Sequence, residues 1–285
     1  MSVTRKTIGR EAELEGVGLH SGASVRLRLR PARCGNGIVF ERRDLDDAPK
    51  LTLADVYKDG PPFRSALKSG HAEVHTVEHL LAALAGLGVT DAEVSLDGPE
   101  VPGLDGSAQP FVIALHEAGI VELNAQIEPV WLRSEVHLAE GASEIMAWPA
   151  DHFQVAYELN YPNELLLQGK YELVVTEESF LNEIAPMRTF CPLKEATALR
   201  AAGFGMGANT HNTLVVDGGK VLDNSFRIPG EPVRHKILDL IGDLYLLGRP
   251  VRARIEARRS GHKLNRLLVE KLTEELRNDL TPGNL

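Results

Sequence analysis

Cysteine is scarce in this 285-residue chain, in which Cys34 and Cys191 stand alone in unrelated contexts. Two isolated cysteines exclude a disulfide framework and any Cys-x-x-Cys metal or redox motif. No stretch approaches the roughly 18 consecutive apolar residues of a membrane span. The basic N-terminal residues are not followed by the apolar segment of a secretory signal. These absences predict a reduced, cytoplasmic protein without stable membrane insertion.

Positive charge is also in deficit, since 31 Lys and Arg against 40 Asp and Glu give a net charge of −9. A nucleic-acid partner held by bulk electrostatics is therefore excluded. An anionic small ligand remains open, because a local basic pocket need not appear in the total. The composition, 43% hydrophobic and 25% charged, is that of a globular protein with one large domain or two medium ones.

The first half alternates between strand and helix patterns. The arginines of "ASVRLRLRPA" alternate with apolar residues, which predicts a half-exposed strand, and "GIVFERRD" predicts a second one. The segment "KDGPPFRSALKSGHAE" is interpreted as a loop or short insertion. From Thr76 the apolar residues follow helical spacing up to a C-terminal stop at Gly88. A strand ("DAEVSLDG"), a turn-rich loop and a helix ("PFVIALHEAGI") follow.

The segment "VELNAQIEPVWL" is interpreted as the boundary between two domains, residues 1–125 and 126–285. Beyond it we expect several strands, a hairpin turning at Asp217-Gly218, a helix in "EPVRHKILDLIGDLYLLG", the strand "VRARIEAR" and a terminal helix. Both halves run helix, glycine, strand, loop, helix, a weak pseudo-repeat. It predicts an α+β fold of two similar domains, each a β-sheet layer packed against helices, whose histidine-bearing helices meet at the interface.

Two short patterns suggest a metal. His75, Glu78 and His79 spell H-x-x-E-H, the pattern of inverted zinc peptidases, in which both histidines bind zinc and the glutamate is the general base. A chance match at a helix start is the alternative. His235, Asp239 and Asp243 are spaced i, i+4, i+8, so they share one helix face and are suited to hold a metal ion. The alternative there is a solvated polar stripe.

Six blocks in order resemble one family nearly end to end: "GVGLHSG", "TVEHLLAALAGLGV", "PEVPGLDGSAQPFV", "RTF", "VRHKILDLIGDLYLLG" and "SGHKLN". Together they resemble the bacterial UDP-3-O-acyl-N-acetylglucosamine deacetylases, zinc amidases of Gram-negative bacteria. The resemblance implies hydrolysis of the N-acetyl group of UDP-3-O-(acyl)-N-acetylglucosamine to acetate and UDP-3-O-acyl-glucosamine, the committed step of lipid A synthesis. The H-x-x-E-H zinc metallopeptidase remains the alternative.

The resemblance also implies a metal site at the domain interface. Its ligands would be His79, His235 and Asp239, with a fourth position left for water, as in catalytic zinc sites. A site of two histidines and one aspartate accepts Fe²⁺ as well as Zn²⁺. His75 has no ligand counterpart in the family.

The family pattern implies four catalytic residues. Glu78 would be the general base, and the Thr189 hydroxyl would stabilise the oxyanion together with the metal. His262 would act as a cation and donate a proton to the leaving amine. Asp243 would hold that imidazole charged and oriented.

The resemblance suggests substrate contacts as well. Phe190 and Lys236 would face the nucleotide-sugar, His20 would lie near the diphosphate or sugar, and Arg259 would suit a pyrophosphate. Ordinary surface charge is the alternative for His20 and Arg259. An insertion near residues 192–212 would form the apolar passage for the acyl chain, or simply pack as a helix.

The chain departs from the family pattern at two places. Cys191-Pro192 follow "RTF" where relatives often have glycine and an aromatic, and Ser65–Gly70 lie in a segment that is usually rich in threonine. A lysine that some relatives present near Ser143 is absent as well. These departures bear on acyl-length preference and inhibitor fit rather than on the chemistry. A monomer is expected, because no exposed apolar stripe is evident.

Overall fold

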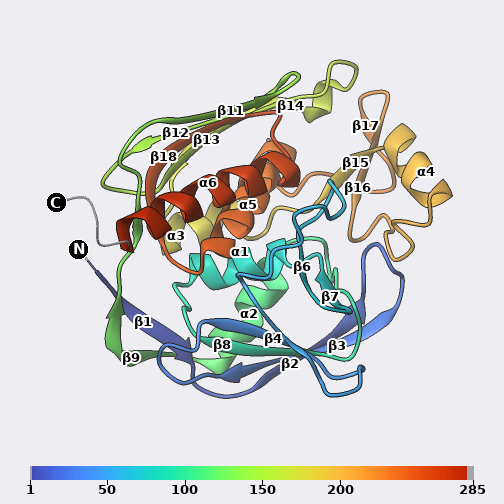
Figure 1. Ribbon diagram of the computed structural model, residues 1–285. Helices are drawn as coiled ribbons and strands as arrows, with labels where there is room; N and C mark the ends of the chain where they lie inside the picture. The colour runs from blue at the N-terminus through green and yellow to red at the C-terminus, as the bar shows by residue number, and fades with distance from the viewer. Residues whose placement is uncertain (1, 281–285) are drawn as a thin grey trace.

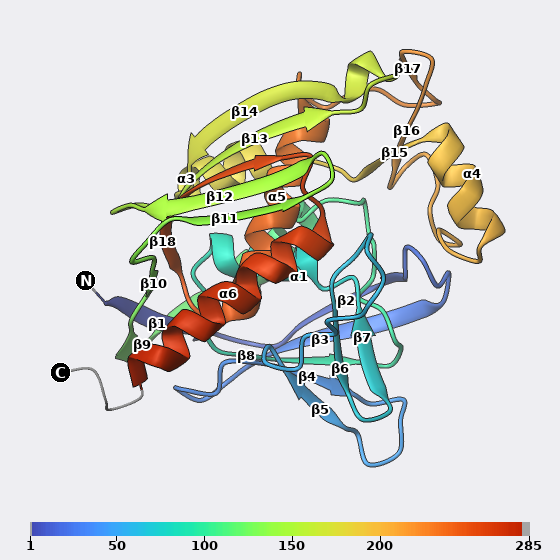
Figure 2. The ribbon, with the colours of Figure 1, turned by 45° about the horizontal axis from the view of Figure 1, so that its top comes forward.

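Two twisted β-sheets enclose a layer of helices in the computed structural model, which describes residues 2–280 (Figure 1). The same layers appear in the turned view of Figure 2. The fold is therefore mixed α+β, with sheets packed against helices. No helix in the described part of the chain is long and apolar enough to cross a membrane.

The first sheet has the strand order β2-β3-β8-β4-β5. Its strands are β2 (Ala12–Val17), β3 (Ser24–Pro31), β4 (Ile38–Arg42), β5 (Lys50–Thr52) and β8 (Ala92–Leu96). Val25, Leu27 and Leu29 of β3 are buried, which confirms the predicted half-exposed strand. The arginines between them pair across the outer face with the glutamates of β2 and its preceding residue. Alternation in the sequence thus becomes one buried face and one charged face.

The second sheet has the order β11-β12-β18-β13-β14, with β10 (Val130–Trp131) pairing with the start of β18. Its strands are β11 (Val136–Glu140), β12 (Ser143–Pro149), β13 (Gln154–Asn160), β14 (Gln168–Val174) and β18 (Val251–Arg258). The first sheet has one parallel pair, β4 with β8, and in the second β18 pairs in parallel with both β13 and β10. If the strands of each sheet are numbered in chain order, the two sheets have the same spatial order of strands, and in both the last strand lies in the middle. This agrees with the predicted pseudo-repeat.

The central layer contains one inner helix from each half of the chain. Helix α1 (Glu78–Gly86) precedes β8, and α5 (Glu231–Leu244) precedes β18. Helices α2 (Gln109–Ala118) and α6 (His262–Leu280) follow β8 and β18. The expected helices and strands are present, and Pro232 lies in the first turn of α5.

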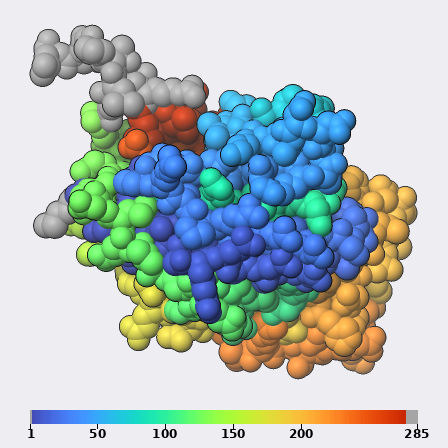
Figure 3. All heavy atoms as spheres, turned by 90° about the horizontal axis from the view of Figure 1, so that it is seen from below, coloured from blue at the N-terminus to red at the C-terminus, as the bar shows by residue number. Residues whose placement is uncertain are grey.

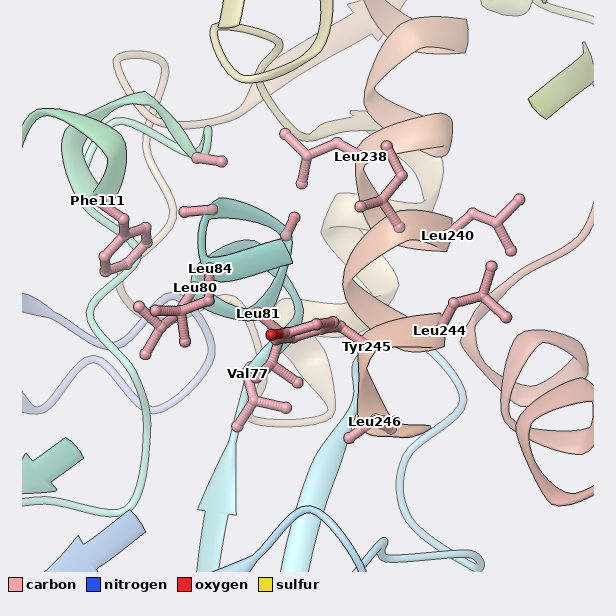
Figure 4. Close-up of a cluster of buried hydrophobic side chains, with 14 of the residues drawn as sticks. Val77, Leu80, Leu81, Leu84, Phe111, Leu238, Leu240, Leu244, Tyr245 and Leu246 are labelled. Atoms are coloured by element: carbon pink, nitrogen blue, oxygen red, sulfur yellow. The ribbon is translucent and has the colours of Figure 1, made fainter. Parts of the chain in front are cut away.

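Helices α1 and α5 approach closely because glycine allows it. A Cβ on Gly242 of α5 would lie 2.0 Å from the carbonyl oxygen of Glu78 at the start of α1. Figure 4 shows the surrounding core, in which Leu80 and Leu84 lie toward Phe111 of α2 and Leu238 turns toward α1. These side chains are completely shielded from solvent. The contact fixes the two helices that carry the predicted metal ligands.

Residues 58–73, together with His75 just after them, are more structured than the sequence suggested. They contain a hairpin of β6 (Ala66–Ser69) and β7 (Ala72–His75), although a loop or short insertion was expected. Gly60, Pro61 and Pro62 all precede Ser65, Gly70 lies at the turn between the two strands, and the alternation in β7 is too short to be recognised. This hairpin leads the chain directly into α1.

The remaining elements flank the two sheets. Strand β1 (Val3–Ile8) pairs with β9 (Ile120–Ile127), so the boundary placed between residues 125 and 126 falls within a strand. A short sheet of β15 (Phe190–Pro192), β16 (Leu214–Asp217) and β17 (Lys220–Val221) carries α4 (Leu193–Ala201) beside it. The hairpin at Asp217-Gly218 is confirmed. Short helical turns occupy η1 (Leu165–Leu167), α3 (Glu177–Ser179), η2 (Phe180–Ile184) and η3 (Tyr245–Leu247). In Figure 3, residues of the first half cover the face seen from below, and the orange segment with α4 lies at one side.

Candidate metal centre

A cavity of about 740 Å³ opens between the two halves of the chain. Helices α1 and α5, the segment from Thr189 through α4, and the turn before α6 all contribute to its wall. Ten of the residues singled out in the sequence line it: His20, Glu78, His79, Thr189, Phe190, His235, Lys236, Asp239, Arg259 and His262. Asp243 does not line the cavity and lies buried behind His262.

His79, His235 and Asp239 form a buried cluster at the base of this cavity. Their potential ligand atoms all lie within 4.8 Å of one another, and no other group in the described residues meets that condition. Asp239 Oδ1 is 3.2 Å from His235 Nε2 and 3.6 Å from His79 Nε2. The solvated-stripe alternative for α5 is therefore wrong, because His235, Asp239 and Asp243 are all buried.

The cluster has the properties expected of a cation site. Asp239 Oδ1 is buried and has no hydrogen-bond partner among the described residues, a costly arrangement unless a ligand satisfies it. His235 Nδ1 lies 2.9 Å from the carbonyl oxygen of Met187, to which it donates. That bond directs the second ring nitrogen, Nε2, to Asp239, and a backbone carbonyl holding one ring nitrogen is the usual arrangement of a metal-bound histidine. The donor set of two imidazoles and one carboxylate therefore fits a divalent metal.

The Lys236 ammonium donates a 2.6 Å hydrogen bond to the other oxygen of Asp239, Oδ2. Burial opposes ionisation of this carboxyl, but His235 and Lys236 outweigh burial and hold the pKa of Asp239 well below its ordinary value. Asp239 is thus a carboxylate at neutral pH. One of its oxygens is held by lysine, and the other is directed to the two histidines.

Glu78 lies beside this cluster at the first position of α1. One carboxylate oxygen, Oε2, accepts the backbone N–H of Ser65 at 3.1 Å, and Oε1 lies 3.9 Å from His262 Nε2. Burial raises the pKa of Glu78 to about 7. A carboxyl whose pKa is near neutrality can accept and return a proton at physiological pH.

His262 is held from behind by Asp243. His262 Nδ1 lies 2.9 Å from Asp243 Oδ2, which also accepts the side-chain amide of Asn265 at 2.8 Å. The Ser65 hydroxyl donates to Asp243 Oδ1 at 2.5 Å. Burial by itself lowers the pKa of His262, but the nearby carboxylates of Asp243 and Glu78 outweigh burial and raise this pKa to about 9. The imidazole is therefore cationic at neutral pH, with Nε2 facing the cavity and Glu78.

Thr189 and Phe190 also line the cavity. The segment is anchored by Arg188, whose buried guanidinium pairs with Glu231 at the start of α5. The Thr189 backbone is held on both sides, since its N–H donates to Gly106 and its carbonyl accepts from Leu214. The Phe190 ring lies edge-on to His235, with 6.2 Å between ring centroids. A shift of this segment would therefore reach the metal cluster.

His20 and Arg259 lie farther along the same cavity. The His20 ring is buried against Phe63 and Phe204, at centroid distances of 4.8 and 6.3 Å. Burial lowers the pKa of His20 to about 4, so this imidazole is neutral at physiological pH. Arg259 follows β18 and is exposed at the cavity wall. The surface-charge alternative thus fails for His20, whose ring is enclosed.

Two residues of this arrangement carried no assigned role in the sequence. Asn265 lies one helical turn after His262, so the spacing in "SGHKLN" could have placed it on the same face. Ser65 gave no signal, because it bonds to Glu78 and Asp243 only through the tertiary fold.

His75 lies outside the cluster. It ends strand β7, before α1 begins, and its Nε2 is 2.9 Å from Glu73. The two histidines of H-x-x-E-H therefore do not share one helix, as the peptidase arrangement requires.

Comparison with known proteins gives a uniform result. Residues 5–274 match the family model described as UDP-3-O-acyl N-acetylglycosamine deacetylase. Relatives named UDP-3-O-acyl-N-acetylglucosamine deacetylase occur in Myxococcus xanthus (39% identity, covering 96% of this chain and 88% of the relative) and in Acidithiobacillus ferrooxidans (40% identity, 90% and 86%). A Coxiella burnetii protein of the same name is 36% identical, with 95% and 90% covered.

Proposed function

The chain belongs to the UDP-3-O-acyl N-acetylglycosamine deacetylase family, and we propose that His79, His235 and Asp239 hold its catalytic zinc ion. The enzyme removes the N-acetyl group of UDP-3-O-acyl-N-acetylglucosamine in lipid A synthesis. The family and the displaced His75 both disfavour a zinc peptidase. The observation that carries the metal assignment is the orphaned Oδ1 of Asp239 between two buried imidazoles.

Zinc held by His79, His235 and Asp239 would supply Lewis-acid chemistry: it would lower the pKa of a water molecule from about 15.7 towards about 7 and polarise the acetamide carbonyl. Fe²⁺ suits the same ligands. Glu78, with its pKa near neutrality, takes the proton from the attacking water. The Thr189 hydroxyl, on a residue that also lines the cavity, donates a hydrogen bond to the oxyanion that forms on the amide carbonyl.

Release of the amine depends on His262. An amine is a poor leaving group until it is protonated, and the His262 cation faces the same space as Glu78. His262 Nε2 donates the proton to the departing nitrogen, while Asp243 holds Nδ1 and keeps the ring charged and oriented. The base, Glu78, and the acid, His262, thus lie on two different helices, α1 and α6.

Substrate recognition is assigned to the rest of the cavity wall. Phe190 and Lys236 contact the nucleotide-sugar, His20 lies near the sugar or diphosphate, and Arg259 meets the pyrophosphate. The apolar passage for the acyl chain runs along residues 192–212, whose helix α4 has no buried residue and directs Leu193 and Leu199 to the cavity. A UDP-linked acylated amino sugar has both the anionic and the apolar parts that these walls complement.

The architecture supports two similar domains, residues 1–125 and 126–285, with the metal at their interface. The matching strand orders of the two sheets favour this division, since α1 and α5 then occupy corresponding positions. His79 comes from the first and His235 with Asp239 from the second. A monomeric state and a cytoplasmic location stay predictions.

The Glu78→Gln variant tests the assigned chemistry. Because Glu78 is not a proposed ligand, this variant should keep stoichiometric zinc while its kcat falls by about 10² to 10⁴-fold, the range for general acid–base catalysis. Zinc content and acetate release are measured on the same preparation. Full activity of the zinc-loaded variant would remove Glu78 from the mechanism.

A further inference from the structure

Glu100 is a buried carboxylate that the mechanism above does not use. It lies between β8 and α2, is 1% exposed and does not line the cavity. Its Oε1 accepts the His20 backbone N–H at 2.9 Å and the Thr76 hydroxyl at 2.7 Å. Its Oε2 accepts the Ser21 backbone N–H at 2.7 Å. One side chain therefore joins the loop that carries His20 to Thr76, two residues before α1 begins.

Thr76 adopts a backbone conformation that a β-branched residue rarely has. Its φ is 56°, in the left-handed region, and it links strand β7 to the helix that begins at Glu78. Such conformations persist only where the surroundings hold them. Here the Thr76 hydroxyl is bound to Glu100, and backbone bonds tie His75 to Pro99 and Val101 on either side of that glutamate. The direction in which α1 leaves β7 is thus set by the segment around Glu100.

The other side of Glu100 meets the loop of "GLHSG". A Cβ on Gly18 would lie 2.5 Å from Glu100 Oε2, so only glycine lets the carboxylate reach this loop. The two backbone N–H groups that it accepts belong to His20 and Ser21. These bonds hold the backbone from which the His20 ring extends to pack against Phe63 and Phe204.

We propose that Glu100 is a positioning residue that sets the geometry between His20 on one cavity wall and Glu78 with His79 at the start of α1. The proposal rests on the function assigned above and adds a residue outside the cavity to it. Glu100 touches neither substrate nor metal. It acts through Thr76 on the base and one ligand, and through the His20–Ser21 backbone on substrate binding.

The site requires a carboxylate rather than an amide. Both Glu100 oxygens accept from backbone N–H groups, and a carboxylate is acceptor-only, whereas glutamine replaces one oxygen with a donor. Whichever way the new amide of the Glu100→Gln variant turned, its NH₂ group would face a backbone N–H of His20 or Ser21. The substitution therefore keeps the shape and breaks the network.

The test compares four variants for zinc affinity, kcat, KM and thermal unfolding. Glu100→Gln should raise KM and lower kcat, with kcat/KM at least about tenfold below the parent, and should bind zinc more weakly in competition with a chromophoric chelator. Thr76→Val removes only the hydroxyl and should lower kcat and zinc affinity with little change in KM. Thr76→Ser keeps the hydroxyl and should restore both.

Asp91→Asn is the matched control. Asp91 is also a fully buried carboxylate, paired with Arg5 and accepting the Gly37 N–H, but it does not line the cavity or touch any of these residues. It should lower the unfolding temperature while KM, kcat and zinc affinity stay unchanged. If Glu100→Gln behaves like Asp91→Asn, or if Thr76→Val matches Thr76→Ser, the proposal is wrong. A parent enzyme that releases no acetate overturns the assigned function instead, and the zinc affinities still test Glu100.

Discussion

Glu78 Oε1 and His262 Nε2 lie 3.9 Å apart in the cavity, on the first residue of α1 and the first residue of α6. Burial raises the pKa of Glu78 to about 7, while Asp243 and Glu78 overcome burial and raise the pKa of His262 to about 9. Between these values the carboxyl is ionised and the imidazole is protonated. The pair therefore offers a base and an acid at the same pH, as amide hydrolysis requires.

Replacing His235 and His75 in turn should distinguish the two interpretations of the H-x-x-E-H pattern, the proposed deacetylase ligands and the zinc peptidase. His235→Ala removes an imidazole 3.2 Å from the orphaned Asp239 oxygen, so it should lose bound zinc and activity. His75→Ala removes a side chain bonded to Glu73 outside the cluster, and it should retain both. Metal analysis of the two purified proteins decides the matter. Zinc loss in the His75 variant alone would contradict the ligand assignment.

Asp243→Asn should move the alkaline limb of the pH profile of kcat/KM to lower pH. Activity should fall at low pH as Glu78 gains a proton and at high pH as His262 loses one. The bound cation lowers both pKa values, so these limbs lie at or below about 7 and about 9. Asp243 raises the pKa of His262, and its removal must therefore move the alkaline limb to lower pH. An alkaline limb that stays in place would show that His262 is not the acid.

Gly242→Ala should disturb the contact between α1 and α5. The new Cβ would lie 2.0 Å from the carbonyl oxygen of Glu78, so we expect a loss of about 1–3 kcal/mol in the free energy of unfolding, typical of overpacking. Activity should fall too, because the helices that carry the base and the ligands must move apart.

Gly169→Ala in β14 is the control for that change. Its new Cβ would meet only a Val233 methyl group at 3.8 Å, an ordinary van der Waals contact. Denaturant unfolding and zinc content should therefore be close to the parent values. Equal effects of the two substitutions would mean that the α1–α5 contact is not as tight as described.

Much of the fold could be predicted from periodicity and punctuation. The alternation in β3 and the helical spacing after Thr76 identify their elements, because burial of one face requires those periods. The hairpin β6–β7 was missed because each strand is only four residues long. Its register depends on packing against the rest of the chain, which local pattern does not contain.

The candidate site, like the fold, could be predicted from the sequence only in part. His235, Asp239 and Asp243 could be placed on one face from spacing alone, but their burial depends on α1 packing against that face. The meeting of His79 with α5 needed the family resemblance, since the two lie far apart in the chain. Ser65 and Glu100 act through contacts that only the tertiary fold creates. No local pattern marks such residues.

Acetate release from UDP-3-O-acyl-N-acetylglucosamine, measured on the zinc-loaded enzyme before and after chelation, tests the account most directly. We expect turnover by the loaded enzyme, its loss when the chelator removes the metal, and its return when zinc is added back. Stoichiometric zinc without acetate release, or acetate release that persists in the metal-free protein, would contradict it.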